Sequence, residues 1–138
     1  MRIVFDVNVL VSSLIVKGRP RELWLKARDR EFTLILSDQI VSEFITVVGR
    51  RKFTGYVEEH DLRIFLEALH RTAIFAKVRS KFRIVKDDPS DDIILRTAHD
   101  SRASYIVSGD RHLLTLREFK GVRIVTVDEM LRLLKGGG

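Results

Sequence analysis

Short apolar runs alternate along the chain with longer segments in which apolar residues recur every three or four positions. The short runs are rich in β-branched residues, as buried strands are, and cover residues 3–5, 33–36, 104–107 and 122–126. The longer segments have the spacing of amphipathic helices and cover residues 9–16, 20–30, 37–50, 58–71, 90–102, 112–116 and 127–134. Residues 74–78 fit either a helix extension or a short edge strand. This alternation predicts an α/β fold with a mainly parallel sheet.

Acidic side chains follow two of the predicted strands. Asp6 comes directly after the first strand, and Asp110 follows the strand at residues 104–107. Because ligands of open α/β sheets bind at the carboxyl ends of the strands, both carboxylates are expected at such a binding edge. Asp6 is therefore a candidate metal ligand or nucleophile. The structural alternative is that Asp6 or Asn8 only caps the next helix.

A third acid lies on the inward face of a predicted helix. Glu43 shares that face with Ile40 and Val47. A carboxylate there is costly unless it is paired, hydrogen-bonded or bound to a metal. The structural alternative is an ion pair with Arg50 or Arg51.

A fourth acidic region, residues 87–92, spans the start of the helix at residues 90–102. Four of its six residues are acids: Asp87, Asp88, Asp91 and Asp92. One acid satisfies a helix cap, so four exceed that need. Asp91 is spaced to share the inward face of the helix, whereas Asp92 is expected at one side. Carboxylates that converge from all these segments would repel one another, and a bound divalent cation would resolve the repulsion.

The composition limits the kinds of metal site and the cellular location that we expect. The 138 residues fit one domain, expected over residues 1–135, with a disordered tail at 136–138. The absence of cysteine excludes disulfides and zinc–thiolate sites, and the four histidines lack paired metal-ligand spacing. Oxygen ligands are therefore expected, which favours Mg²⁺ or Mn²⁺. The sequence has no signal-peptide pattern and no apolar stretch of about 18 residues, so we expect a cytoplasmic location without membrane contact.

The charge balance indicates a polyanionic partner. The chain has 25 basic and 19 acidic residues, a formal charge of +6, and nucleic acid is the simplest partner for such a surface. Candidate phosphate contacts are Arg19, Arg21, Arg50, Arg51, Lys52 and Arg111. Scarce amide side chains, together with 32% charged residues, are typical of a thermophilic source.

Four segments in a fixed order carry a resemblance that covers nearly the whole chain. They are Phe5-Asp6-Val7-Asn8-Val9-Leu10, the segment from Ser37 to Phe44, Asp88-Pro89-Ser90-Asp91-Asp92, and Tyr105-Ile106-Val107-Ser108-Gly109-Asp110. In these segments the chain resembles the PIN-domain metal-dependent ribonucleases, which include the VapC-type toxins of toxin–antitoxin modules. The Asp-Pro pair of the third segment is similar to that of a prokaryotic PIN branch.

The resemblance implies a three-layer α/β/α sandwich with an acidic pocket for Mg²⁺ or Mn²⁺. It implies catalytic and metal-ligand roles for Asp6, Glu43, Asp91 and Asp110. It implies supporting roles for Asn8, Ser12, Asp88, Asp92 and Ser108. The expected reaction is hydrolysis of RNA phosphodiester bonds by metal-activated water. A toxin role would bring a small antitoxin protein as partner, and homodimers or higher homo-oligomers are common in the family.

Two alternatives from other classes stay open at this point. A degenerate PIN-like domain could act as a binding or assembly module without catalysis. An aspartyl-phosphate enzyme also places an Asp after the first strand. Phosphatases of that class need Asp-x-Asp there, however, and this chain has Asp6-Val7-Asn8.

Overall fold

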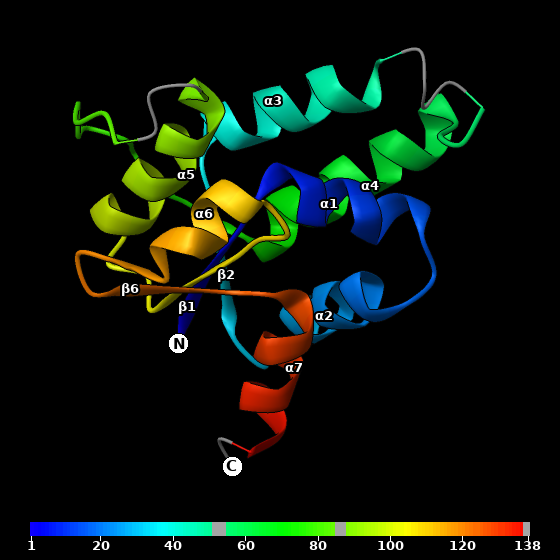
Figure 1. The fold of residues 1–138 in the computed structure, drawn as a ribbon. Helices are drawn as coiled ribbons and strands as arrows, with labels where there is room; N and C mark the ends of the chain where they lie inside the picture. Colours follow the sequence, from blue (N-terminus) through cyan, green and yellow to red (C-terminus); the bar gives the residue numbers. More distant parts are fainter. Residues whose placement is uncertain (51–54, 85–87, 137–138) are drawn as a thin grey trace.

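A computed structural model describes residues 1–50, 55–84 and 88–136 (Figure 1). Its centre is a six-stranded sheet in the order β3-β2-β1-β4-β6-β5, parallel except for the β5–β6 pair. The strands are β1 (Arg2–Phe5), β2 (Thr33–Leu36), β3 (Ile74–Phe75), β4 (Tyr105–Val107), β5 (Glu118–Phe119) and β6 (Val122–Val125). The predicted α/β fold with a mainly parallel sheet is confirmed.

Seven helices surround the sheet in the described residues. They are α1 (Val7–Ile15), α2 (Arg19–Arg28), α3 (Asp38–Val48), α4 (Glu59–Thr72), α5 (Pro89–Asp100), α6 (Arg111–Leu116) and α7 (Val127–Gly136). Helix α5 packs across β1, β2 and β4, whereas α2 packs against α1 and α7. In Figure 1, α3 and α5 lie above the strands and α7 lies below them. Helices therefore cover both faces of the sheet.

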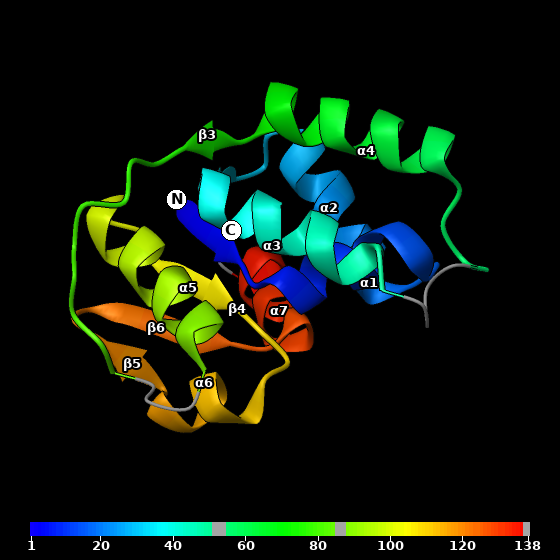
Figure 2. The same ribbon diagram turned by 90° about the horizontal axis from the view of Figure 1, so that it is seen from above.

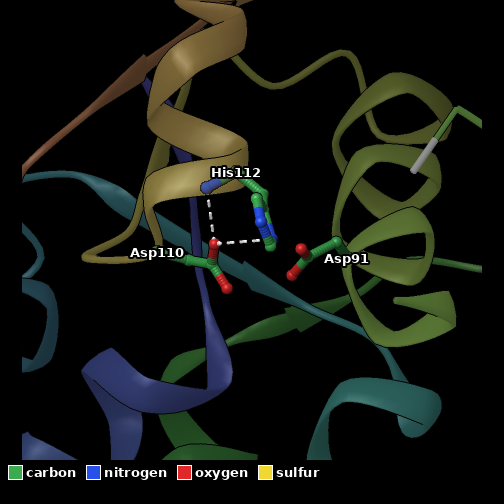
Figure 3. A group of neighbouring side chains, drawn as sticks. All are labelled: Asp91, Asp110 and His112. Atoms are coloured by element: carbon green, nitrogen blue, oxygen red, sulfur yellow. Dashed lines mark hydrogen bonds and ion pairs between the residues drawn. The ribbon is translucent and has the colours of Figure 1, made fainter. Parts of the chain in front are cut away.

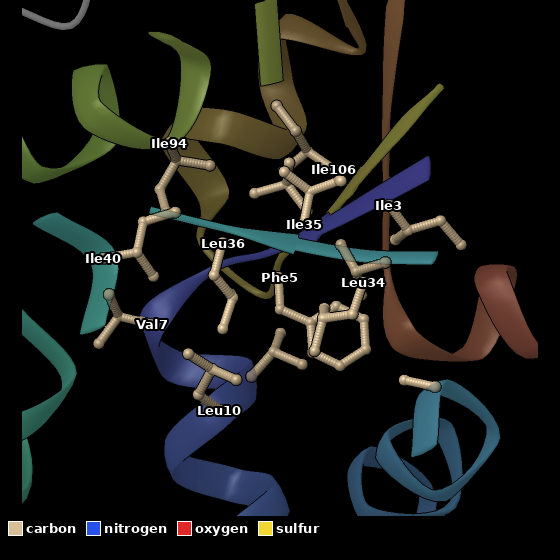
Figure 4. Packing of buried hydrophobic residues seen from close by; sticks show 14 of the residues in the cluster. Ile3, Phe5, Val7, Leu10, Leu34, Ile35, Leu36, Ile40, Ile94 and Ile106 are labelled. Atoms are coloured by element: carbon tan, nitrogen blue, oxygen red, sulfur yellow. The ribbon is translucent and has the colours of Figure 1, made fainter. Parts of the chain in front are cut away.

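The core forms where the three central strands meet α1, α3 and α5 (Figure 4). Side chains of β1 and β2 that are closed off completely from solvent include Ile3, Phe5 and Leu34. They are short apolar runs with neighbours on both faces, which is why these strands are fully buried. Trp24 contacts Phe65 with ring centroids 5.2 Å apart, so it anchors α2 to α4 in the core.

Local sequence signals account for the starts of α3 and α5. The Ser37 hydroxyl accepts a hydrogen bond from the backbone N–H of Ile40 and caps α3. Pro89 occupies the first turn of α5, where its missing N–H costs nothing, and Asp88 is the N-cap. Both helices begin next to the carboxyl ends of strands, so their first turns face the same edge of the sheet.

The structure decides one open alternative and adds two features that the sequence did not predict. Residues 74–75 form the edge strand β3, parallel to β2, and not a helix extension. Strand β5 was not predicted, because two residues are too few to show an alternating pattern. Helix α7 includes Gly136, which we expected in the tail, because a terminal helical turn tolerates glycine. No helix in the described part of the chain is long and apolar enough to cross a membrane.

Candidate functional site

Asp6 lies at the point where β1 passes into α1. Its side chain is 5% exposed, and its backbone N–H donates to the Val107 carbonyl at 3.0 Å. Asp6 is the N-cap residue of α1, although its side chain makes no capping hydrogen bond to the helix. Burial raises the pKa of the Asp6 carboxyl, and a hydrogen bond from Ser108 opposes that increase.

Ser108 joins the two strand-end acids. Its hydroxyl donates to Asp6 Oδ2 at 2.6 Å and accepts from the backbone N–H of Asp110 at 2.9 Å. The residue is fully buried. The end of β1 and the loop after β4 are therefore held together by one hydroxyl. The supporting role of Ser108 in metal binding stays a prediction.

Asp110 caps α6 and faces Asp91 across the site. Its Oδ1 accepts from the backbone N–H of His112 at 2.7 Å. Asp91, Asp110 and His112 each offer one ligand atom, and these atoms lie within 4.8 Å of one another (Figure 3). Three convergent ligand atoms can hold a divalent cation.

Asp91 is a buried acid whose carboxylate lacks a full set of hydrogen-bond partners among the described residues. It is 3% exposed, and its Oδ2 has no hydrogen-bond partner among the described residues. Burial, followed by repulsion from Asp110, Asp88, Asp6 and Asp92, raises the pKa of its carboxyl to about 7. A buried, unpaired carboxylate oxygen among other acids is an arrangement that a bound cation would stabilise.

Asp92 and Asp88 have local structural bonds. Asp92 is as buried as Asp91, at 3% exposed, so the expectation that it lies at one side is wrong. The segment before α5 covers it, and the Ile84 N–H donates to its Oδ1 at 2.8 Å. Asp88 caps α5 by accepting from the Ser90 N–H at 3.0 Å. Asp87 lies outside the described residues.

Glu43 lies apart from the three-residue group. Its side chain is 32% exposed, and its Oε1 is 4.0 Å from Nη2 of Arg50. The structural alternative, a pair with Arg50, is therefore present, although such a long and solvated contact is weak. Helix α3, which carries Glu43, packs against both α1 and α5. The ligand role of Glu43 stays a prediction.

His112 was missed by the sequence argument. The histidines were judged by their spacing from one another, whereas His112 is paired with an acid two positions earlier. Its Nδ1 lies 3.8 Å from Asp110 Oδ1. An aspartate that caps a short helix places the residue two positions later beside its own carboxylate, and this capping pattern was the available signal.

Asn8 and Ser12 line a pocket next to the acids. The pocket has a volume of about 280 Å³ and also includes Ser108, Gly109 and Thr126. Because Ser108 bonds Asp6, the pocket adjoins the acidic group directly. Asn8 and Ser12 therefore line a pocket beside the carboxylates, and their supporting roles stay a prediction.

The basic residues expected near phosphates have varied surroundings. Arg19 pairs with Asp128 at 2.9 Å, and Arg21 donates to the carbonyls of Ser13 and Leu14. Arg111 is exposed directly after Asp110. Positions 51 and 52 lie outside the described residues.

Comparison with protein families gives a match that covers most of the chain. No curated protein matches the chain. The family model described as PIN domain matches residues 2–112, which include all four predicted carboxylates and His112. PIN domains are generally nucleases, and the cluster of convergent acids suits that chemistry. The chain belongs to the PIN domain family.

Proposed function

We propose that this protein is a divalent-metal-dependent ribonuclease that hydrolyses RNA phosphodiester bonds. The observation that carries the proposal is the buried Oδ2 of Asp91, which has no hydrogen-bond partner among the described residues and lies beside Asp110 and His112. Membership of the PIN family supports a nuclease and a nucleic-acid substrate. The basic overall charge of +6 supports the same class of substrate.

The donor set fits a hard divalent cation. Asp91 and Asp110 would hold Mg²⁺ or Mn²⁺, with His112 as a further donor. Asp6 lies next to them through Ser108, and Glu43 would complete the set from α3. A bound cation of this kind supplies a nucleophilic water near neutral pH and stabilises charge on the phosphoryl oxygens.

The residues of the chain contribute orientation and protonation state. Ser108 fixes the orientation of the Asp6 carboxylate and the position of the Asp110 backbone. Asp91, with its pKa raised to about 7, exchanges a proton in the physiological range, and a cation nearby favours its ionised form. The buried setting of Asp6 and Asp91 excludes water from one side of the site and strengthens electrostatic interactions there.

The proposal is tested by cleavage of end-labelled single-stranded RNA. Metal-stripped protein receives Mg²⁺ or Mn²⁺ in steps, with Asp6→Asn and Asp91→Asn in parallel. We expect metal-dependent cleavage that both substitutions remove. Asp38→Asn, an exposed acid at the start of α3, is the matched control and should cleave normally. Cleavage that survives Asp6→Asn and Asp91→Asn would contradict the proposed site.

We further propose that the nuclease is the toxin of a toxin–antitoxin pair with a small antitoxin protein as partner. The resemblance of the chain to PIN-domain ribonucleases, a family that includes the VapC-type toxins, supports this role. An antitoxin-like reading frame next to the gene, whose product suppresses RNA cleavage when added, is the expected result. A neighbouring product that binds the chain without reducing cleavage would contradict it.

A further inference from the structure

We infer that four arginines form a track that binds the phosphates of single-stranded RNA beyond the cleaved bond. This arginine track consists of Arg111, Arg117, Arg123 and Arg132. It runs from the acidic group over α6 and β6 to α7, and Figure 1 shows α6 above β6 and α7 below it. The inference rests on the proposed function, because it names the path of that substrate.

Three neighbouring hollows make the track continuous. The first begins at Gly109, beside the acidic group, and includes Arg111 and Arg117. The second, with a volume of about 500 Å³, shares Arg117 with the first and adds Arg123. The third, of about 400 Å³, shares Arg123 with the second and adds Arg132. The shared arginines therefore place the three hollows next to one another, from the acidic group to α7.

The four guanidinium groups are available for an anion. All four residues are exposed, and in the described parts of the chain none of them forms an ion pair with a carboxylate. Arg123 lies over the ring of Tyr105, with Cζ 5.7 Å from the centroid, which leaves its N–H groups free to bind outward. This differs from Arg19 and Arg21, whose side chains already have protein partners.

Two glutamates in the same hollows do not cancel this charge. Glu129 accepts from the backbone N–H and the hydroxyl of Thr126, at 3.2 and 3.1 Å, and so serves the start of α7. Glu118 is exposed at the rim of the second hollow. The track therefore keeps an excess of positive charge, and planar guanidinium groups suit bidentate contacts with phosphate.

The family match does not imply this surface. It ends at residue 112, and three of the four arginines follow that position. Continuity with the acidic group favours a nucleic-acid strand over an acidic protein, because only the strand would have one phosphate at the acids and others along the track. Single-stranded RNA is flexible enough to follow the turn from α6 to α7.

The test measures RNA affinity against salt concentration without divalent metal, so that no cleavage occurs. Arg117→Gln/Arg123→Gln is compared with Arg63→Gln/Arg71→Gln, which removes the same charge from α4. Figure 2 shows α4 and α6 at opposite ends of the molecule. Each phosphate contact with a single strand contributes about 0.7 to the slope of log affinity against log salt. The track variant loses two contacts, so the magnitude of its slope should be smaller by about 1.4, whereas the slope of the control variant should stay unchanged.

A second arm reads the far end of the track. Arg132→Gln should weaken the binding of a long RNA strand and leave the binding of a short strand unchanged, because only the long strand reaches the third hollow. Thermal unfolding checks that all variants fold alike. Equal slopes for both double variants would overturn the inference. A protein that binds an acidic peptide through these arginines but does not bind RNA would overturn it as well. Arginine-dependent binding without metal-dependent cleavage would uphold the track and overturn the proposed nuclease.

Discussion

Ser108 connects two acids that are separated by about a hundred residues of sequence, and its hydroxyl bonds both segments. Ser108→Ala should raise the pKa of Asp6 further, because the hydrogen bond that opposes the effect of burial is lost. We expect weaker metal binding and a loss of about 1–3 kcal/mol in the free energy of unfolding. Calorimetric titration with Mn²⁺ and chemical denaturation measure the two effects.

Ser13→Ala is the matched control for that substitution. The Ser13 hydroxyl is also buried and donates to the Val9 carbonyl at 2.7 Å, away from the acids. Its loss should destabilise the fold by a similar amount and leave metal affinity unchanged. Equal losses of metal affinity in both variants would show that Ser108 has no specific link to the site.

The raised pKa of Asp91 predicts a pH dependence of metal binding. Burial and neighbouring acids raise the pKa of the Asp91 carboxyl to about 7. Protons therefore compete with the cation for this carboxylate below that pH. Mn²⁺ affinity should fall by about tenfold for each pH unit below about 7 and level off above it. Titration at a series of pH values measures this, and an affinity that does not change across the range would contradict the assignment of Asp91.

The same shift predicts how stability depends on pH without metal. The pKa of the Asp91 carboxyl is about 7 in the folded state and 3.8 ordinarily. The contribution of this group to the free energy of unfolding is therefore fully present below about pH 4 and is lost as the pH rises through about 7. Asp91→Asn cannot ionise, so it should raise the free energy of unfolding at neutral pH by up to about 4 kcal/mol. Urea denaturation in chelator measures this. A variant less stable than the parent at pH above 7 would contradict the argument.

Individual site residues differ in how well the sequence alone predicts them. Asp6 and Asp91 were predicted because a strand end and a helical face each place a carboxylate inward, and both are buried. Glu43 shares the same helical periodicity, yet it remains 32% exposed beside Arg50. Periodicity gives the direction of a side chain around its helix, but not how far the neighbouring elements cover it.

At the scale of elements, Ser37 and Thr97 connect the start of α3 to the body of α5. The two hydroxyl oxygens are 2.9 Å apart and fully buried. Thr97 Oγ1 also donates to the Ile93 carbonyl, so the Ser37 hydroxyl donates to Thr97. One hydrogen bond thereby ties the N-cap of α3 to the middle of α5, the helix that carries Asp91.

A double-mutant cycle tests this link. Ser37→Ala and Thr97→Val should each destabilise the fold, and their coupling energy should be about 1 kcal/mol because they share one hydrogen bond. Denaturant unfolding of the four proteins gives the value. Thr46→Val, which loses an exposed hydroxyl of α3, should show no coupling to Thr97→Val, and strictly additive effects of the first pair would contradict the link.

Elements were predictable where they are long or strongly apolar. Helices α3 and α5 have clear caps and apolar faces, and β1, β2 and β4 end in continuous buried runs. In β6 the exposed Arg123 interrupts the buried residues. Strands β3 and β5 contain two residues each and depend on the neighbouring strand for their backbone bonds. Their structure is therefore set by tertiary contact, which a local pattern does not contain.

At the scale of the whole molecule, sheet order produces the site. Strand β1 lies between β2 and β4, so residues from the start and the end of the chain meet at one edge. The parallel direction could be predicted from the alternation of elements, but the order of strands could not. The continuous surface that carries Arg117 and Arg123 depends on the β5–β6 pair and was for that reason outside the sequence prediction.

The most direct test of the metal site is anomalous diffraction from crystals soaked in Mn²⁺. We expect an anomalous peak between the carboxylates of Asp91 and Asp110, next to His112, and no peak there in Asp91→Asn crystals. Asp38→Asn crystals serve as the control and should keep the peak. A peak elsewhere at saturating Mn²⁺, or none at these carboxylates, would contradict the central claim that they form the metal centre.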